Sequence, residues 1–143
     1  MNPDSAAGNS EAPTGKTRRI LLLDDDSNTL FVLHSVLEQT KAQVIECEDE
    51  PCAVRQCNAL AKSIDLLVAD VMLQDSSGPA VVRKVKPLQP SMRLLYISGF
   101  SLAELHRRGL LSATEMSPGL VEFLQKPFSP GEFLDSVERL LLN

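Results

Sequence analysis

Short apolar runs, separated by segments long enough to form helices, most constrain how this chain can fold. Four of the runs are nearly continuous in apolar residues, and each ends in a polar side chain. Such runs are typical of strands that lie in a parallel sheet with both faces covered. We therefore predict five parallel strands, at 19–23, 43–48, 64–69, 93–97 and 121–125.

Helices are expected between and after these strands, at 27–39, 50–61, 78–86, 101–108 and 129–142. Ser129-Pro130-Gly131-Glu132 is a capping box with proline at the first helical position, so the last helix has a clear start. Gly109 is suited to end the fourth helix. Five β/α units with right-handed crossovers give an α/β fold, a doubly wound three-layer sandwich.

Length and composition indicate one globular domain that follows a short tail. The chain has 143 residues, and residues 1–18 are polar and rich in Pro and Gly, so we predict a disordered tail or linker there and a folded domain at 19–143. The net charge of −5 argues against a general nucleic-acid binder. There is no secretory signal and no apolar stretch long enough to cross a membrane, so we expect a cytoplasmic location without membrane contact.

The cysteines Cys47, Cys52 and Cys57 are odd in number and spaced by five residues. A disulfide framework favours an even number in a secreted protein, and zinc favours closer pairs or nearby histidines. We therefore predict reduced thiols that pack as small hydrophobic side chains.

The polar residues that end the apolar runs form a candidate site. Asp24 and Asp25 follow the first strand, Asp70 the third, Ser98 the fourth and Lys126 the fifth. A single such residue is commonly a turn, a helix cap or a solvated side chain. Because the carboxyl ends of parallel strands line one edge of the sheet, where ligands bind, their joint occurrence indicates a functional site.

The chemistry of this set favours a divalent cation and a phosphoryl group. Three close carboxylates repel each other, so at least one should have a raised pKa unless a cation neutralises them. Mg²⁺ takes one or two carboxylates and completes its shell with water and phosphate oxygens. Lys126 and the Ser98 hydroxyl can bind phosphoryl oxygens. Because no histidine or cysteine is expected at the end of a strand, Asp70 is the expected nucleophile, and Asp26 is interpreted as a surface carboxylate or helix N-cap.

Residues 19–143 resemble a response-regulator receiver domain of two-component signalling. The matching segments are 20–26, 65–73, 96–100 and 123–128. The resemblance implies a flavodoxin-like fold with strand order 2-1-3-4-5 and phosphorelay signal transduction. The Ser-Gly-Phe and Phe-Leu-Gln-Lys-Pro-Phe motifs look most like the C-terminal receivers of hybrid histidine kinases, and the sequence fits a free-standing receiver as well as an excised one.

The resemblance also assigns roles to individual residues. Asp70 would be the phosphoacceptor, and Mg²⁺ would be bound by Asp24, Asp25, Asp70 and the backbone carbonyl of Met72. Ser98 and Phe123 would be a switch pair, and Lys126-Pro127 would be a cis peptide. The sequence departs from the family at Gln74, where proline is usual, and in additional length at 112–119.

The family further implies partners and an output surface. The phosphoryl donor would be a histidine kinase or a histidine phosphotransfer domain, and phosphorylation would alter the face of the fourth helix, fifth strand and fifth helix. That face would also allow a homodimer. Direct binding of nucleic acid is not expected. The chain is expected to catalyse only its own phosphorylation and dephosphorylation, and not to act as an enzyme on other substrates.

Two alternatives remain. An aspartyl phosphatase of the haloacid dehalogenase type would need a different residue at Asn28 and a late acidic pair, whereas only Glu132, Asp135 and Glu138 follow Lys126. A pseudo-receiver that only binds a partner would not need the complete set of acidic, hydroxyl and basic residues at the strand ends.

Overall fold

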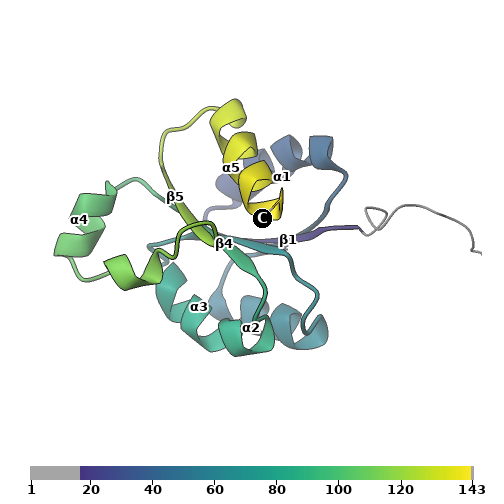
Figure 1. The fold of residues 1–143 in the computed structure, drawn as a ribbon, viewed down its shortest axis with the longest axis horizontal. Coiled ribbons are helices and arrows are strands. Elements are labelled where there is room, and N and C mark those ends of the chain that lie inside the picture. Colours follow the sequence, from purple (N-terminus) through teal and green to yellow (C-terminus); the bar gives the residue numbers. More distant parts are fainter. Residues whose placement is uncertain (1–16, 143) are drawn as a thin grey trace, which may run out of the picture.

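The protein is a five-stranded parallel sheet between two layers of helices (Figure 1). The computed structural model describes residues 17–142, so most of the predicted tail lies outside the described residues. The strand order is β2-β1-β3-β4-β5, which confirms the predicted fold. The strands are β1 (Arg19–Leu23), β2 (Gln43–Cys47), β3 (Leu66–Asp70), β4 (Arg93–Ser98) and β5 (Val121–Gln125).

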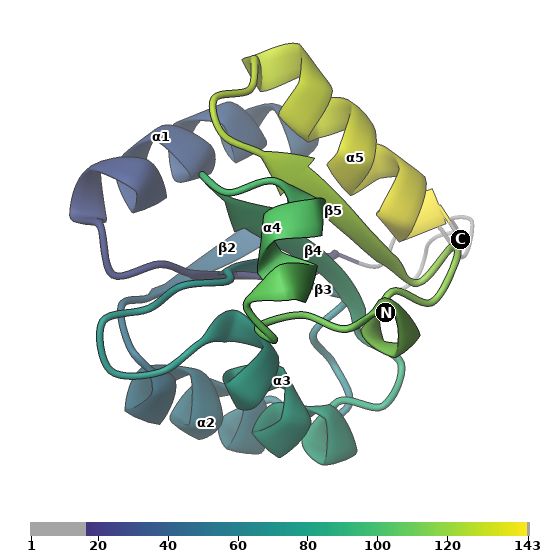
Figure 2. The same cartoon turned by 90° about the vertical axis from the view of Figure 1, so that its left-hand side faces the viewer.

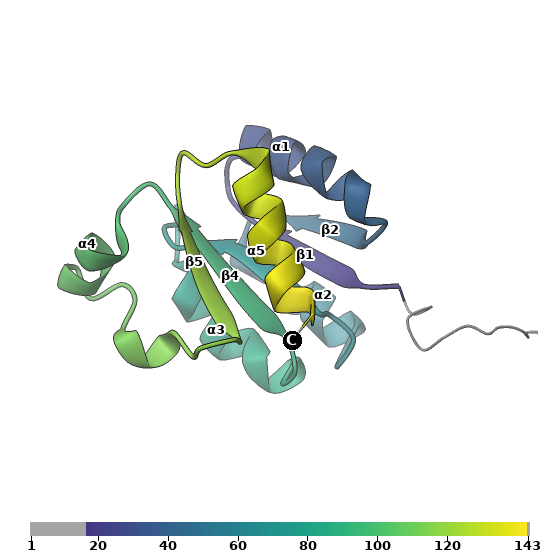
Figure 3. The ribbon, with the colours of Figure 1, turned by 45° about the horizontal axis from the view of Figure 1, so that its top comes forward.

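Two pairs of helices cover the two faces of the sheet. α1 (Ser27–Leu37) and α5 (Pro130–Leu142) lie on one face, and α2 (Glu50–Ala59) and α3 (Gly78–Val85) on the other (Figures 1 and 3). α4 (Leu102–Arg107) stands out from the sheet beyond the end of β4, in front of the strands in Figure 2. Each face has its own cluster of buried apolar side chains.

The burial of the central strands explains their continuous apolar runs. β3 is buried along its whole length, and β1 and β4 are buried except at their first residues. Alternate residues of one strand enter different clusters: Leu21 packs on the α2 side and Leu22 on the α1 side. β2 and β5 are the edge strands, and their residues are mostly half-buried.

The helix termini follow the predicted local signals. The Ser129 hydroxyl accepts from the Glu132 N–H and the Glu132 carboxylate accepts from the Ser129 N–H, so the capping box is confirmed. Gly109 has φ 71° directly after α4, and the N–H of Leu110 bonds to the carbonyl of Leu105, as in a Schellman cap.

Several predicted boundaries were wrong by one or two residues. β3 begins at Leu66 rather than at 64 and extends to Asp70. α1 and α3 each end in a 3₁₀ turn, Glu38–Thr40 and Lys86–Leu88 respectively. Pro87 lies at the start of the second of these turns, where its missing N–H leaves no hydrogen bond of that turn unmade, whereas it could not continue the α-helix.

The prediction of three reduced thiols was wrong for two of them. Cys47 ends β2 and Cys52 lies in the first turn of α2, and the tight loop between them brings their Cα atoms to 5.4 Å and their sulfur atoms into a disulfide. Cys57 is a free, buried thiol, as predicted. Burial raises its pKa to about 11, so it is chemically inert packing.

Within residues 17–142, none of the helices has both the length and the apolar character that a membrane-spanning segment requires.

Candidate functional site

The sheet brings most of the predicted site residues to one edge. Asp70 and Ser98 are the last residues of β3 and β4, while Asp24 and Lys126 directly follow β1 and β5. Neighbouring strands are parallel and in register, which places these four positions side by side. The predicted assembly at the carboxyl edge of the sheet is therefore present.

Lys126 joins two of the carboxylates. Its ammonium nitrogen lies 3.0 Å from Oδ2 of Asp70 and 3.5 Å from Oδ2 of Asp24. Burial alone would lower the pKa of Lys126, but the hydrogen bond and charge of Asp70 and the charge of Asp24 outweigh it, so the pKa is raised. Lys126 is therefore positively charged at neutral pH and compensates part of the acidic cluster.

Asp70 is held by the loop that follows it. Its Oδ1 accepts from the N–H of Met72 at 2.9 Å, while Oδ2 accepts from Lys126. The residue is buried, with 8% of its surface exposed. Both oxygens are thus fixed by hydrogen bonds at the carboxyl edge of the sheet.

Asp24 is the most deeply buried of the three carboxylates. It is 1% exposed; Oδ1 accepts from the N–H of Asp26 at 2.8 Å, but Oδ2 is buried without a hydrogen-bond partner. Burial raises the pKa of Asp24 to about 6, against the Asp26 N–H that lowers it, and the negative charge of Asp70 adds to the increase. The predicted raised pKa in the cluster is confirmed, with burial as its main cause.

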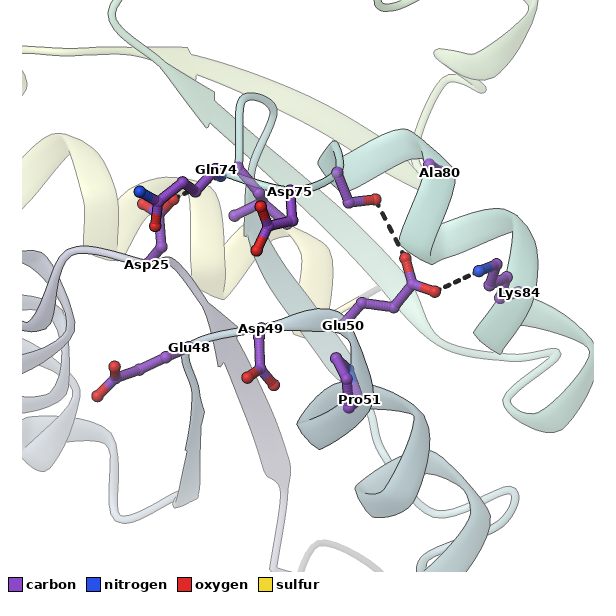
Figure 4. Close-up of a pocket in the computed structure, with 11 residues that line it drawn as sticks. Asp25, Glu48, Asp49, Glu50, Pro51, Gln74, Asp75, Ala80 and Lys84 are labelled. Carbon is purple, nitrogen blue, oxygen red and sulfur yellow. Dashed lines mark hydrogen bonds and ion pairs between the residues drawn. The ribbon is translucent and has the colours of Figure 1, made fainter.

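Asp25 is separated from the other two carboxylates by its hydrogen bond. Its Oδ2 accepts from the backbone N–H of Gln74 at 2.6 Å, and the two residues lie together in Figure 4. Proline, usual at this position in the family that the sequence resembles, has no N–H to donate. Among residues 17–142, no group of three or more acidic, histidine or cysteine side chains is close enough to hold a metal ion. The predicted three-carboxylate cluster is divided here: Lys126 joins Asp24 and Asp70, and Gln74 holds Asp25.

The predicted switch residues lie on neighbouring strands. Ser98 is buried, and its hydroxyl accepts from the N–H of Phe100 at 3.0 Å. Its carbonyl accepts from the N–H of Lys126 at 2.7 Å, which ties the ends of β4 and β5 together. Phe123 is half-buried opposite Tyr96, against the cluster on the α2 side. The Lys126-Pro127 peptide is cis, as the resemblance implied.

Gly78 was not among the site residues predicted from the sequence, whereas Asp26 has the N-cap role that was predicted as one of two possibilities. A Cβ atom at Gly78 would lie 2.5 Å from the carbonyl oxygen of Asp70, so only glycine fits without moving the backbone. The signal was a glycine that directly follows the N-cap Ser77 and precedes Pro79, at a helix start where a glycine has no capping purpose. Asp26 is the N-cap of α1, and its carboxylate accepts from the N–H of Asn28.

Two hollows flank the site. An acidic cleft of about 660 Å³ lies between the β2–α2 loop and the β3–α3 loop, with Asp25 and Gln74 on one side and Asp49 on the other (Figure 4). A smaller groove of about 350 Å³ lies between α1 and the residues after β5, and Lys126, Val32 and Phe128 line it. Phe31, on the same helix, is 71% exposed. A ligand or partner can therefore approach the site along apolar surface from one side and acidic surface from the other.

Sequence comparison relates the chain to one family. The sequence model of the response regulator receiver domain matches residues 20–138. Response regulator SaeR of Staphylococcus epidermidis is 25% identical over 122 residues, which are 85% of this chain and 49% of SaeR. The response regulator receiver protein CpdR of Brucella abortus is 22% identical over 125 residues, 87% of this chain and 98% of CpdR. The chain thus spans about half the length of SaeR and nearly all of CpdR.

Solved structures agree with this relationship. The response regulator receiver protein from Sinorhizobium medicae superposes with a TM-score of 0.73 at 27% identity, covering 89% of this chain and 96% of that one. The receiver domain of the hybrid histidine kinase CckA superposes with a TM-score of 0.70 at 24% identity, covering 86% and 98%. The second likeness supports the fold alone.

Proposed function

Because the chain belongs to the family of response regulator receiver domains, we propose that Asp70 accepts a phosphoryl group from a phosphohistidine. The donor would be a histidine kinase or a histidine phosphotransfer protein. The observation that carries the proposal is the environment of Asp70: a carboxylate at the end of the central strand, bound by Lys126 and next to the buried Asp24. Such a pair of one nucleophilic carboxylate and one ammonium suits phosphoryl transfer.

The transfer needs no general base on this chain. An oxygen of ionised Asp70 attacks phosphorus, the bond from phosphorus to the histidine nitrogen breaks, and the imidazole leaves with the bonding electrons and takes a proton from solvent. Lys126, whose side chain is about one-third exposed, then turns from Asp70 to a phosphoryl oxygen. The Ser98 hydroxyl contacts another oxygen, and the bond to the Phe100 N–H adjusts.

The residues present fit a magnesium ion. Asp24 has a buried oxygen without a hydrogen-bond partner and a raised pKa, both of which a cation would relieve. Asp24, Asp25, Asp70 and the Met72 carbonyl would hold the ion, and Asp25 would have to leave the Gln74 N–H to join the other two carboxylates. When bound, Mg²⁺ neutralises charge on the phosphoryl group as it is transferred.

The surface around Lys126 suits a protein donor. Phe31 and Val32 are exposed on α1, and Val32 lines the groove that contains Lys126. A partner that covers these side chains would place its phosphohistidine close to Asp70. Phosphorylation would then alter the face formed by α4, β5 and α5, through Ser98 and Phe123, and this face is the proposed surface for output or self-association. We place this exchange in the cytoplasm. The likeness to hybrid-kinase receivers remains a prediction.

Intact-mass measurement after incubation with acetyl phosphate tests the proposal. With Mg²⁺ the protein should gain the mass of one phosphoryl group, and without Mg²⁺ the gain should be much slower. Asp70→Asn should abolish the gain. Asp75→Asn is the matched control, since Asp75 is an exposed carboxylate of the adjacent loop and should leave the gain intact. Phosphorylation that persists in Asp70→Asn would contradict the assignment, and no phosphorylation of the wild type would favour the pseudo-receiver.

A further inference from the structure

The disulfide lies in a part of the receiver that faces the site. Cys47 is the last residue of β2 and Cys52 the third residue of α2, so the bond closes the β2–α2 loop on itself. The carbonyl of Cys47 accepts from the N–H of Asp24 at 3.1 Å. The backbone at one end of the bridge is therefore hydrogen-bonded directly to the most buried carboxylate residue of the site.

The loop inside the bridge also forms a wall of the acidic cleft. Glu48, Asp49 and Glu50 line that wall, across from Asp25 and Gln74 (Figure 4). Asp49 caps α2 by accepting from the N–H of Cys52 at 3.0 Å, and Glu50 binds the Ser76 hydroxyl at 3.1 Å. A change in the bridge can therefore reach Asp24 through β2. It can also reach the β3–α3 loop through Glu50.

The two cysteines differ in their exposure to solvent. Cys47 is 1% exposed, whereas Cys52 is half-buried at the start of a helix beside the cleft. The Cys52 sulfur lies 3.8 Å from the carbonyl of Glu46, which is an acceptor for its thiol when the bond is open. The geometry therefore accommodates the oxidised form and offers the reduced Cys52 thiol a partner.

We propose that Cys47 and Cys52 form a reversible thiol–disulfide site that reacts with small disulfides of the glutathione class. The Cys52 thiolate attacks one sulfur of the small disulfide, forming a mixed disulfide and releasing one small thiolate. The Cys47 thiolate then attacks the Cys52 sulfur, forming the bridge and releasing the second small thiolate. Two protein thiols are oxidised and one small disulfide is reduced to two thiolates, which take up, through solvent, the two protons that the protein thiols lose.

Oxidation restrains the wall of the cleft that carries Glu48, Asp49 and Glu50, and reduction frees it. The oxidised state removes conformations in which β2 and the first turn of α2 move apart, because their Cα atoms are tied at 5.4 Å. The hydrogen bond from Asp24 to Cys47 transmits this restraint to the site. This coupling does not depend on phosphorylation of Asp70.

Glutathione redox buffers applied to the purified protein test the proposal. Oxidising buffer should remove two thiols per chain without dimerisation, and peptide mapping after alkylation should find the bond between Cys47 and Cys52. Cys57→Ser is the matched control and should behave as the wild type, because Cys57 is buried outside the bridge. Cys47→Ser should stop at a mixed disulfide on Cys52, whereas Cys52→Ser should react roughly tenfold more slowly, because its remaining thiols are buried.

The effect of the Cys47–Cys52 bond on the site is measured separately. Amide exchange of residues 48–52 should slow on oxidation, and the NMR shift of the Asp24 amide should change, in wild type and Cys57→Ser alike. A bond that involves Cys57, oxidation that only links two chains, or an Asp24 amide that does not respond would each overturn the proposal. All of these measurements are made without a phosphodonor, so their failure is distinct from a failure of phosphorylation at Asp70.

Discussion

Replacing Asp24 by asparagine should stabilise the fold at neutral pH. Burial raises the pKa of Asp24 from 3.8 to about 6, so ionising this carboxyl costs more free energy in the folded state than in the unfolded chain. At about 1.4 kcal/mol per pKa unit, this ionisation destabilises the wild type by about 3 kcal/mol at most. Asparagine keeps an oxygen to accept from the Asp26 N–H, which aspartate binds at 2.8 Å, and removes the buried charge.

Lys126 reduces the increase in stability that is expected for Asp24→Asn. Its ammonium lies 3.5 Å from Asp24 and 3.0 Å from Asp70, so the substitution removes one of its two partners and leaves the closer one. We therefore expect Asp24→Asn to raise the free energy of unfolding by about 1–2 kcal/mol at neutral pH. Because the folded-state pKa is the raised one, the wild type is not penalised below pH 3.8. The penalty grows as the pH rises from 3.8 to about 6 and is constant above about 6.

Urea unfolding of both proteins across this pH range gives the difference directly. The stability of Asp24→Asn minus that of the wild type should be small at pH 4, should grow up to about pH 6 and should then level off. Asp75→Asn, which alters an exposed carboxylate, should show no such growth. A difference that is the same at every pH, or a less stable Asp24→Asn at neutral pH, would refute the reasoning.

Two further substitutions probe the loop after Asp70. Gln74→Pro removes the N–H that binds Asp25 at 2.6 Å and should raise the affinity for Mg²⁺ several-fold in calorimetric titration, whereas Gln74→Ala, which keeps the N–H, should not. Weaker binding by the proline variant would mean that the N–H holds Asp25 in its metal-binding position. Gly78→Ala should lower the free energy of unfolding by about 1–3 kcal/mol and slow phosphorylation of Asp70, because its Cβ would meet the Asp70 carbonyl oxygen. Gly131→Ala, at an open position in α5, should be neutral or slightly stabilising, and equal losses in the two glycine variants would contradict this explanation.

The fold could be predicted because the sequence carries its signals locally. A strand such as β3 is buried on both faces, so its residues are apolar up to Asp70, and β1 shows the same pattern after its first residue. Asp24, Asp70, Ser98 and Lys126 could be placed together because parallel strands end at a common edge. The ends of α1 and α3 could not be placed, since an α-helical turn and a 3₁₀ turn differ little in sequence.

The features of the site that could not be predicted depend on contacts between different segments of the chain. Gly78 is required by the carbonyl of Asp70, eight positions earlier, and composition does not show such a steric limit. The Gln74 N–H that binds Asp25 is a backbone group, which every residue except proline offers. The pairing of Cys47 with Cys52 depends on how sharply the chain turns from β2 into α2, and an odd number of cysteines gives no sign of it.

The carboxylates at the edge of the sheet carry more negative charge than Lys126 can balance, which is why a cation is proposed there. Asp24, Asp25 and Asp70 are opposed by Lys126 alone among the contacts within this group, so two negative charges are left without compensation. A phosphoryl group on Asp70 adds negative charge and draws Lys126 towards itself, which would leave the buried Oδ2 of Asp24 without any nearby ammonium. A divalent cation bound there, as proposed above, would supply the two missing charges. Mg²⁺ should therefore bind less tightly to Asp24→Asn than to the wild type, in the same variant that is more stable without it.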